Sequence, residues 1–178
     1  MFSVYVMGEW LERGMPPHSG VLYTREGVMS KGSHMSYKAD DIARALIQKY
    51  IDLKSPTSSM KLQKVLYYSW VEYYREKRKF LFGDYIYAWK FGPVVPSVYH
   101  EHRKFAGTPI TFCKEPTGKI DGETLQFLSE FAAKYSDYTA GGLVFRTHKP
   151  GTPWSETYGE GRKDVIIPFN RIIELERL

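Results

Sequence analysis

The sequence predicts a mainly α-helical protein of the α+β class, with a single compact helical domain and a small β-hairpin or short strands around residues 80–90. Three observations indicate this class. Apolar residues recur at helical spacing in several segments after residue 34. Aromatic residues between positions 80 and 90 flank a Gly-Asp turn. The length of 178 residues and the 43% hydrophobic content suit one domain with a real core.

Residues 1–34 differ from the rest, because they are rich in glycine and proline and show no sustained period. We interpret them as an irregular N-terminal extension and assign residues 35–178 to the domain. The Gly-Ser-His-Met sequence at residues 32–35 has the form of a cloning remnant, so the extension is either upstream protein sequence or vector-derived. The first residues lack the basic lead of a signal peptide, and no apolar run reaches membrane-spanning length. We therefore expect no membrane partner, and the single cysteine, Cys113, indicates a reducing, cytoplasmic location.

The first expected helix carries its apolar face at Ile42, Leu46 and Tyr50, which are spaced by four residues. Asp40 and Asp41 fall in its first turn, where the helix dipole stabilises negative charge. A proline-containing turn then ends this helix and starts the next one.

A second helix is expected over residues 59–77. Its C-terminal end is basic, which suits the negative end of the helix dipole. Basic groups that accompany tyrosines can also bind phosphates and stack on bases, so nucleic acid is an alternative partner. This alternative is not favoured, because Tyr67 and Tyr68 are neighbours and at least one must face the core. The basic side chains concerned are Lys61, Lys64, Arg75, Lys77, Arg78 and Lys79.

Short strands are expected next, at residues 80–82 and 85–89, around a turn at residues 83–84. Gly92-Pro93 marks a further turn, and Pro96 opens a helix that continues to about residue 105.

The C-terminal half alternates loops and helices. A short strand is expected at residues 110–112, and Asp121 can cap the helix that follows. Trp154 begins a further helical turn, and residues 166–168 lead into a terminal amphipathic helix.

No catalytic, metal or cofactor site is predicted. Cys113 has no histidine close in sequence, which argues against a nucleophile, and as the only cysteine it excludes an internal disulfide. His100 and His102 would point to nearly opposite sides of a helix, so we expect two solvated histidines rather than a metal site. His148 is interpreted as a structural histidine that bonds a carbonyl or packs on an indole, and a hydrolase built around it is the least favoured function.

Three blocks of sequence carry a family resemblance. They are residues 61–68 (KLQKVLYY), residues 88–99 (AWKFGPVVPSVY), and Thr147-His148 followed by Pro153-Trp154. In this order they resemble the Panacea domain, also called SocA-like or phage-associated protein, over about residues 37–176. The resemblance implies a mostly helical antitoxin of a toxin–antitoxin system, found also in prophages, that neutralises a cognate toxin encoded by an adjacent gene. The founding member also delivers its toxin to the ClpXP protease, which would make ClpXP a second partner.

The leading hypothesis is therefore a protein-binding antitoxin without enzymatic activity, and the alternative is a nucleic-acid-associated phage or mobile-element protein. Several motif residues shape the backbone and are assigned to the fold: Gly92, Pro93, Val94, Pro96 and Pro153. The candidate partner-binding residues are aromatic, basic or imidazole side chains, which could equally form a structural network that pins loops together. They are Tyr67, Tyr68, Arg75, Trp89, Lys90, Tyr99, His148 and Trp154.

Overall fold

The computed structural model describes residues 23–24, 27–28, 36–159 and 164–178 of the chain. Most of the predicted N-terminal extension lies outside these residues. Within it, β1 (Tyr23–Thr24) and β2 (Gly27–Val28) pair in antiparallel fashion. The predicted boundary between extension and domain therefore stays a prediction.

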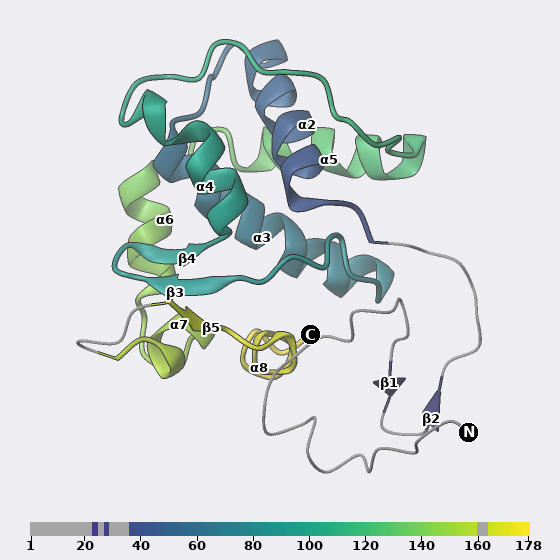
Figure 1. Ribbon diagram of the computed structural model, residues 1–178, viewed down its shortest axis with the longest axis vertical. Coiled ribbons are helices and arrows are strands. Elements are labelled where there is room, and N and C mark those ends of the chain that lie inside the picture. The colour runs from purple at the N-terminus through teal and green to yellow at the C-terminus, as the bar shows by residue number, and fades with distance from the viewer. Residues whose placement is uncertain (1–22, 25–26, 29–35, 160–163) are drawn as a thin grey trace.

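Helices packed around one central helix dominate the described part, as Figure 1 shows. The central helix is α3 (Ser59–Lys77), and it contacts the four helices α2 (Ala39–Asp52), α4 (Pro96–His102), α5 (Gly122–Lys134) and α6 (Ala140–Thr147). This arrangement confirms the predicted mainly α class with a small β element.

The surroundings of α3 explain its burial pattern. A helix that is covered on several sides buries consecutive residues rather than one stripe. All residues from Leu62 to Val71 are buried, including the polar Gln63, Lys64 and Ser69. Ser58 caps the first turn by accepting a hydrogen bond from the amide of Lys61.

The small sheet has the strand order β4-β3-β5, and both pairings are antiparallel. Its strands are β3 (Tyr87–Trp89), β4 (Gly92–Val94) and β5 (Val165–Ile166). The hairpin turns at Lys90 and Phe91, and Gly92 follows with a φ of +99° that glycine tolerates.

The strand expected at residues 85–89 contains β3, but the predicted turn of the hairpin at residues 83–84 and the strand expected at residues 80–82 were wrong. Phe82 forms an isolated parallel bridge with Tyr37, and the carboxylate of Asp84 accepts a hydrogen bond from the amide of Ala39 at 2.9 Å. The segment around Asp84 therefore serves the N-terminus of α2 and does not reverse a strand pair. Gly92 and Pro93, predicted as a turn, lie within β4.

The second half follows the prediction more closely. Asp121 caps α5 by accepting a hydrogen bond from the amide of Thr124 at 2.7 Å, as expected. The strand expected at residues 110–112 is absent from the described residues. Ile110 instead donates its amide to the carbonyl of Thr57, which ties this loop to the start of α3. The remaining helical elements are η1 (Arg103–Phe105), α7 (Pro153–Thr157) and α8 (Phe169–Leu175).

The terminal helix α8 closes over α3 through aromatic contacts. The ring of Trp70 stacks on Phe169 at 4.9 Å, and its indole N–H donates to the carbonyl of Phe82. The hydroxyl of Tyr67 donates to Glu176, just beyond α8, at 2.8 Å. Within the described residues, no helix combines the length and apolar character that a membrane crossing requires.

Candidate functional site

The three sequence blocks meet at the side chain of Lys64. This lysine lies on α3 and is 1% exposed. Its amine donates a hydrogen bond to the carbonyl oxygen of Pro93 on β4, at 2.6 Å. The contact joins the first block to the second, because a buried amine requires such an acceptor.

Gly92 allows this close approach of strand to helix. A Cβ atom at Gly92 would lie 2.7 Å from Oγ1 of Thr147 and 3.1 Å from Nζ of Lys64. The positive φ of Gly92 independently disfavours a side chain. Only glycine therefore fits between the central helix, the hairpin and the end of α6.

The last block holds the hairpin from the other side. The imidazole of His148 lies flat on the indole of Trp154, with ring centroids 3.6 Å apart. The indole N–H of Trp154 donates to the carbonyl of Trp89 at 2.8 Å. Trp89 in turn meets Tyr99 edge to face at 5.0 Å. Together these groups form the Lys64 cluster, which comprises Lys64, Trp89, Gly92, Pro93, Thr147, His148 and Trp154.

Burial sets the electrostatics of the Lys64 cluster. It lowers the pKa of the Lys64 amine from 10.5 to about 7, because the charged form loses its hydration. Burial, together with the nearby charge of Lys64, also lowers the pKa of His148. Nε2 of His148 and Nε1 of Trp89 are buried without a hydrogen-bond partner among the described residues.

The Lys64 cluster is closed to solvent at its centre. Thr147 is 2% exposed, and its hydroxyl donates to the carbonyl of Val144 at 2.8 Å. A substrate would have no open path to Lys64 or Thr147 in this conformation. The arrangement is better suited to holding α3, α6 and the hairpin together than to catalysis.

The predicted partner-binding residues fall into two groups. Trp89, Tyr99, His148 and Trp154 lie together around the hairpin, and the exposed Lys90 lies on its turn. The others lie elsewhere: Tyr67 and Arg75 both reach Glu176, and Tyr68 lies beneath the guanidinium of Arg146.

Tyr67 and Tyr68 are each 2% exposed. A partner would therefore reach them only through the groups that cover them, and their role as contacts stays a prediction. Of the predicted structural residues, Gly92, Pro93 and Val94 are buried in β4. Pro96 and Pro153 stand at the starts of α4 and α7.

The expectation of two solvated histidines was wrong for His102. This residue is 3% exposed, and its Nδ1 lies 3.0 Å from the carbonyl of Val98 one turn earlier. His100 is exposed, so the two side chains do differ in direction. No group of three potential metal ligands occurs in the part of the chain that the structure describes.

The basic set considered for nucleic acid does not form one open strip. Lys64 is buried, and Lys77 pairs with both Glu76 and Glu123. The amine of Lys61 donates to the carbonyl of Ser136 at 2.7 Å. Backbone phosphates would therefore meet only part of the set.

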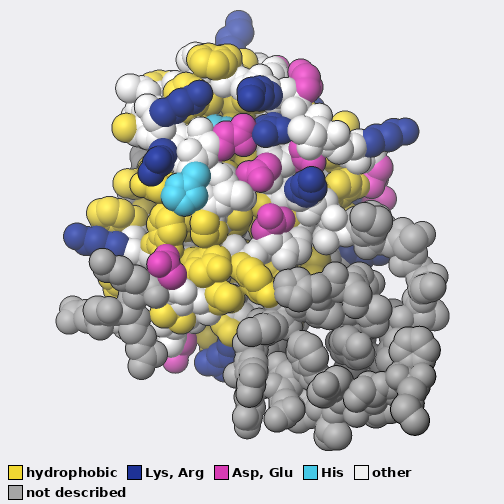
Figure 2. Space-filling model, in the orientation of Figure 1, with side chains coloured by type: hydrophobic (Ala, Val, Ile, Leu, Met, Phe, Trp, Pro, Cys, Tyr) yellow, Lys and Arg dark blue, Asp and Glu magenta, His cyan; other side chains and the backbone are white. Residues whose placement is uncertain are grey.

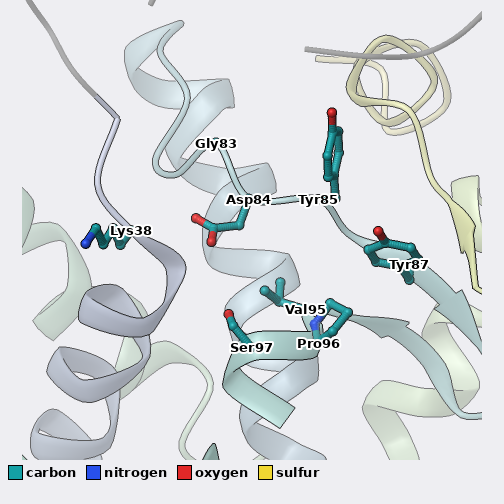
Figure 3. Close-up of a pocket in the computed structure, with 8 residues that line it drawn as sticks. All are labelled: Lys38, Gly83, Asp84, Tyr85, Tyr87, Val95, Pro96 and Ser97. Carbon is teal, nitrogen blue, oxygen red and sulfur yellow. The ribbon is translucent and has the colours of Figure 1, made fainter. Parts of the chain in front are cut away.

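A shallow depression of about 790 Å³ lies between the N-terminal ends of α2 and α4. In Figure 3 the carboxylate of Asp84 is directed toward the start of α2, and the hydroxyl of Ser97 is directed toward Asp84. Asp84 is already engaged in capping α2. The depression is separate from the Lys64 cluster. It is lined by Lys38, Gly83, Asp84, Tyr85, Tyr87, Val95, Pro96 and Ser97.

Sequence reasoning missed a set of exposed aromatic side chains near α6. Phe145 is 71% exposed, Phe91 is 52% exposed and Tyr138 is 44% exposed. Figure 2 shows hydrophobic and basic side chains along the edge of the molecule where α6 and the hairpin turn lie in Figure 1. The signal in the sequence was the Gly141-Gly142 pair, because two glycines leave one side of a short helix bare.

These features define a small α+β domain in which three sequence blocks close one buried polar cluster beneath an aromatic and basic surface. The chain belongs to the family described as antitoxin SocA-like, Panacea domain, whose family model matches residues 62–155. The family that the sequence blocks resemble is thereby confirmed. The matched segment contains the whole Lys64 cluster and α6.

A curated relative supports the same family. Over 64 residues the chain is 39% identical to the protein named Antitoxin SocA from Caulobacter vibrioides (strain NA1000 / CB15N). This match covers 36% of the chain and 34% of the relative, so it spans about a third of the relative's length. No solved structure matches the chain.

Proposed function

We propose that this chain is the antitoxin of a toxin–antitoxin pair and that it neutralises a small toxin by forming a complex with it. Family membership supports the antitoxin role. The observation that carries the mode of action is the exposed aromatic surface within the family-matched segment, at Phe91, Tyr138 and Phe145. Exposed aromatics beside basic side chains are typical of protein-binding surfaces.

Binding rather than catalysis is part of this proposal. The amine of Lys64, whose pKa is strongly lowered, is enclosed by protein atoms and already donates a hydrogen bond. Cys113 lies in a loop with its thiol 3.5 Å from the carbonyl of Arg44, and burial raises its pKa, which keeps the thiol protonated at neutral pH. Neither group is arranged as an activated nucleophile.

Co-expression with the small protein encoded by the adjacent gene tests the proposal. Expression of that protein alone should stop growth, this chain should restore growth, and the two should co-purify. An adjacent product that is harmless, or one that this chain neither rescues nor binds, would contradict the antitoxin assignment.

A finer proposal is that the complex delivers the toxin to the ClpXP protease. The half-life of the toxin separates this from simple neutralisation. Delivery predicts that the toxin decays faster when this chain is present, and only in cells that contain ClpX. Growth rescue with an unchanged toxin half-life would leave complex formation as the whole mechanism.

A further inference from the structure

The outward side of α6 carries an exposed phenylalanine beside a glycine. Leu143 and Thr147 point inward, since they are 0% and 2% exposed. Gly141 and Phe145 are four residues apart and therefore share another side of the helix, which faces solvent. A Cβ atom at Gly141 would meet nothing within 4 Å. Lys149 follows the helix with its amine near the ring of Phe145, and the exposed Tyr138 precedes the helix and borders this side near Arg146. We name this region the α6 face: Tyr138, Gly141, Phe145 and Lys149.

The protein holds the α6 face in a fixed position. Tyr138 stacks on the buried Tyr135 at 5.1 Å, and the guanidinium of Arg146 lies 4.6 Å from the ring centre of the buried Tyr68. At the end of α6, Thr147 packs against Gly92 in the Lys64 cluster. A partner would therefore meet a preformed surface and lose little conformational entropy on this side.

The charge around the α6 face is unequal along the helix. Its C-terminal end carries the exposed Arg146 and Lys149, with the amine of Lys149 5.9 Å from the ring centre of Phe145. The hairpin turn with exposed Lys90 lies beside this end (Figure 1). The acidic Asp137 lies at the opposite end, where its charge acts on Lys61. The C-terminal end therefore complements an acidic partner surface.

We propose that the α6 face docks an amphipathic helix of the toxin. Apolar side chains of that helix pack on Tyr138 and Phe145, and its backbone approaches most closely at Gly141, where no side chain intervenes. Acidic side chains at one end lie against Lys149 and Lys90. This assignment rests on the proposed function and names the surface that performs it.

Gly141→Leu is the sharpest test, because the change is harmless to the free chain. The new side chain enters open space, and leucine has a higher helix propensity than glycine. The melting temperature should stay the same or rise. Binding of the adjacent-gene product, measured by calorimetric titration, should weaken by about tenfold or more, since the leucine occupies the docking position. Gly122→Leu is the matched control, because Gly122 is an equally open glycine on α5.

Two further variants probe the chemistry of the α6 face. Phe145→Ala should weaken binding by about tenfold, whereas Phe112→Ala, which removes a 66% exposed phenylalanine on a different loop, should leave it unchanged. Lys149→Glu should weaken binding and make it less sensitive to salt.

The outcomes separate the two proposals. If the wild-type chain does not bind the adjacent product, the antitoxin function fails and the docking assignment falls with it. If the wild type binds while Gly141→Leu and Phe145→Ala bind equally well, only the docking assignment is overturned. If the wild type sediments as a dimer that Gly141→Leu dissociates, the α6 face binds a second copy of this chain, and the toxin-helix assignment is wrong.

Discussion

The amine of Lys64 and the carbonyl oxygen of Pro93 lie 2.6 Å apart in a buried site, and their hydrogen bond joins the central helix to the hairpin. An amine in such a site resists protonation. The folded protein should therefore respond to pH in a range where few other side chains titrate.

Stability should rise with pH above 7. The pKa of Lys64 is about 7 in the folded chain and near its ordinary 10.5 in the unfolded chain. Between these values the unfolded state binds more protons, so the free energy of unfolding increases with pH, by about 1.4 kcal/mol per pH unit at most. Urea unfolding at pH 7.0, 7.5, 8.0 and 8.5, values chosen at roughly half-unit steps within this window, should show the increase.

Lys64→Met should remove most of this slope, because methionine carries no titrating group. Lys114→Met, at an exposed lysine, should keep it. A Lys64→Met variant whose stability depends on pH as steeply as the wild type would show that another group titrates.

Gly92→Ala should destabilise the fold by roughly 1–3 kcal/mol. The methyl group would press against Thr147 and Lys64, and alanine is strained at a φ of +99°. Gly141→Ala provides the comparison, since it should be neutral or stabilising in its open helical position. Chemical denaturation of both variants measures the difference, and equal stabilities would contradict the packing described for Gly92.

His148→Ala should lower stability by about 1 kcal/mol, because it removes the ring that lies on Trp154. His148→Phe restores a flat ring and should recover part of the loss. The exposed His100 is the control, and its replacement by alanine should change the free energy of unfolding by less than about 0.5 kcal/mol. A His148→Ala variant with unchanged stability would remove the structural interpretation and reopen a chemical one.

Asp41→Ala should loosen the loop that precedes α5. The carboxylate of Asp41 accepts hydrogen bonds from the amides of Thr117 at 2.6 Å and Gly118 at 3.1 Å. Burial alone would raise the pKa of Asp41, but these bonds and the charge of Arg44 outweigh it and lower the pKa below its ordinary value. The interaction should therefore stabilise the fold above about pH 4 and weaken as the pH falls further.

Amide hydrogen exchange at neutral pH measures this effect locally. Exchange at Thr117 and Gly118 should accelerate in Asp41→Ala, with a loss of roughly 1–3 kcal/mol in stability. Asp52→Ala removes an exposed bond to Gln48 and should leave both amides protected. Unchanged exchange in Asp41→Ala would mean that other contacts hold the loop.

Local signals predicted the helices well. Residues 59–77, the cap at Asp121 and the helical turn at Trp154 could be read from spacing, capping chemistry and proline positions. The hairpin could not, because Asp84 serves the distant amide of Ala39, and this contact is invisible in the local sequence.

The candidate site was predicted only in part. Periodicity grouped Lys64 with surface lysines, because a lysine on a helix is usually solvated. Its burial depends on the packing of α6 and β4 against α3, and the local sequence does not reveal such tertiary contacts. The exposed Phe145 was overlooked for the opposite reason, since an apolar residue beside Leu143 is ordinarily assigned to the core.

The two sides of the short helix α6 have different roles. Leu143 and Thr147 anchor it to the interior, while Gly141 and Phe145 touch nothing that folding requires. Replacements on the outward side should therefore leave the architecture intact. If the α6 face binds the toxin as proposed, point mutations there would change the choice of partner without destabilising the fold.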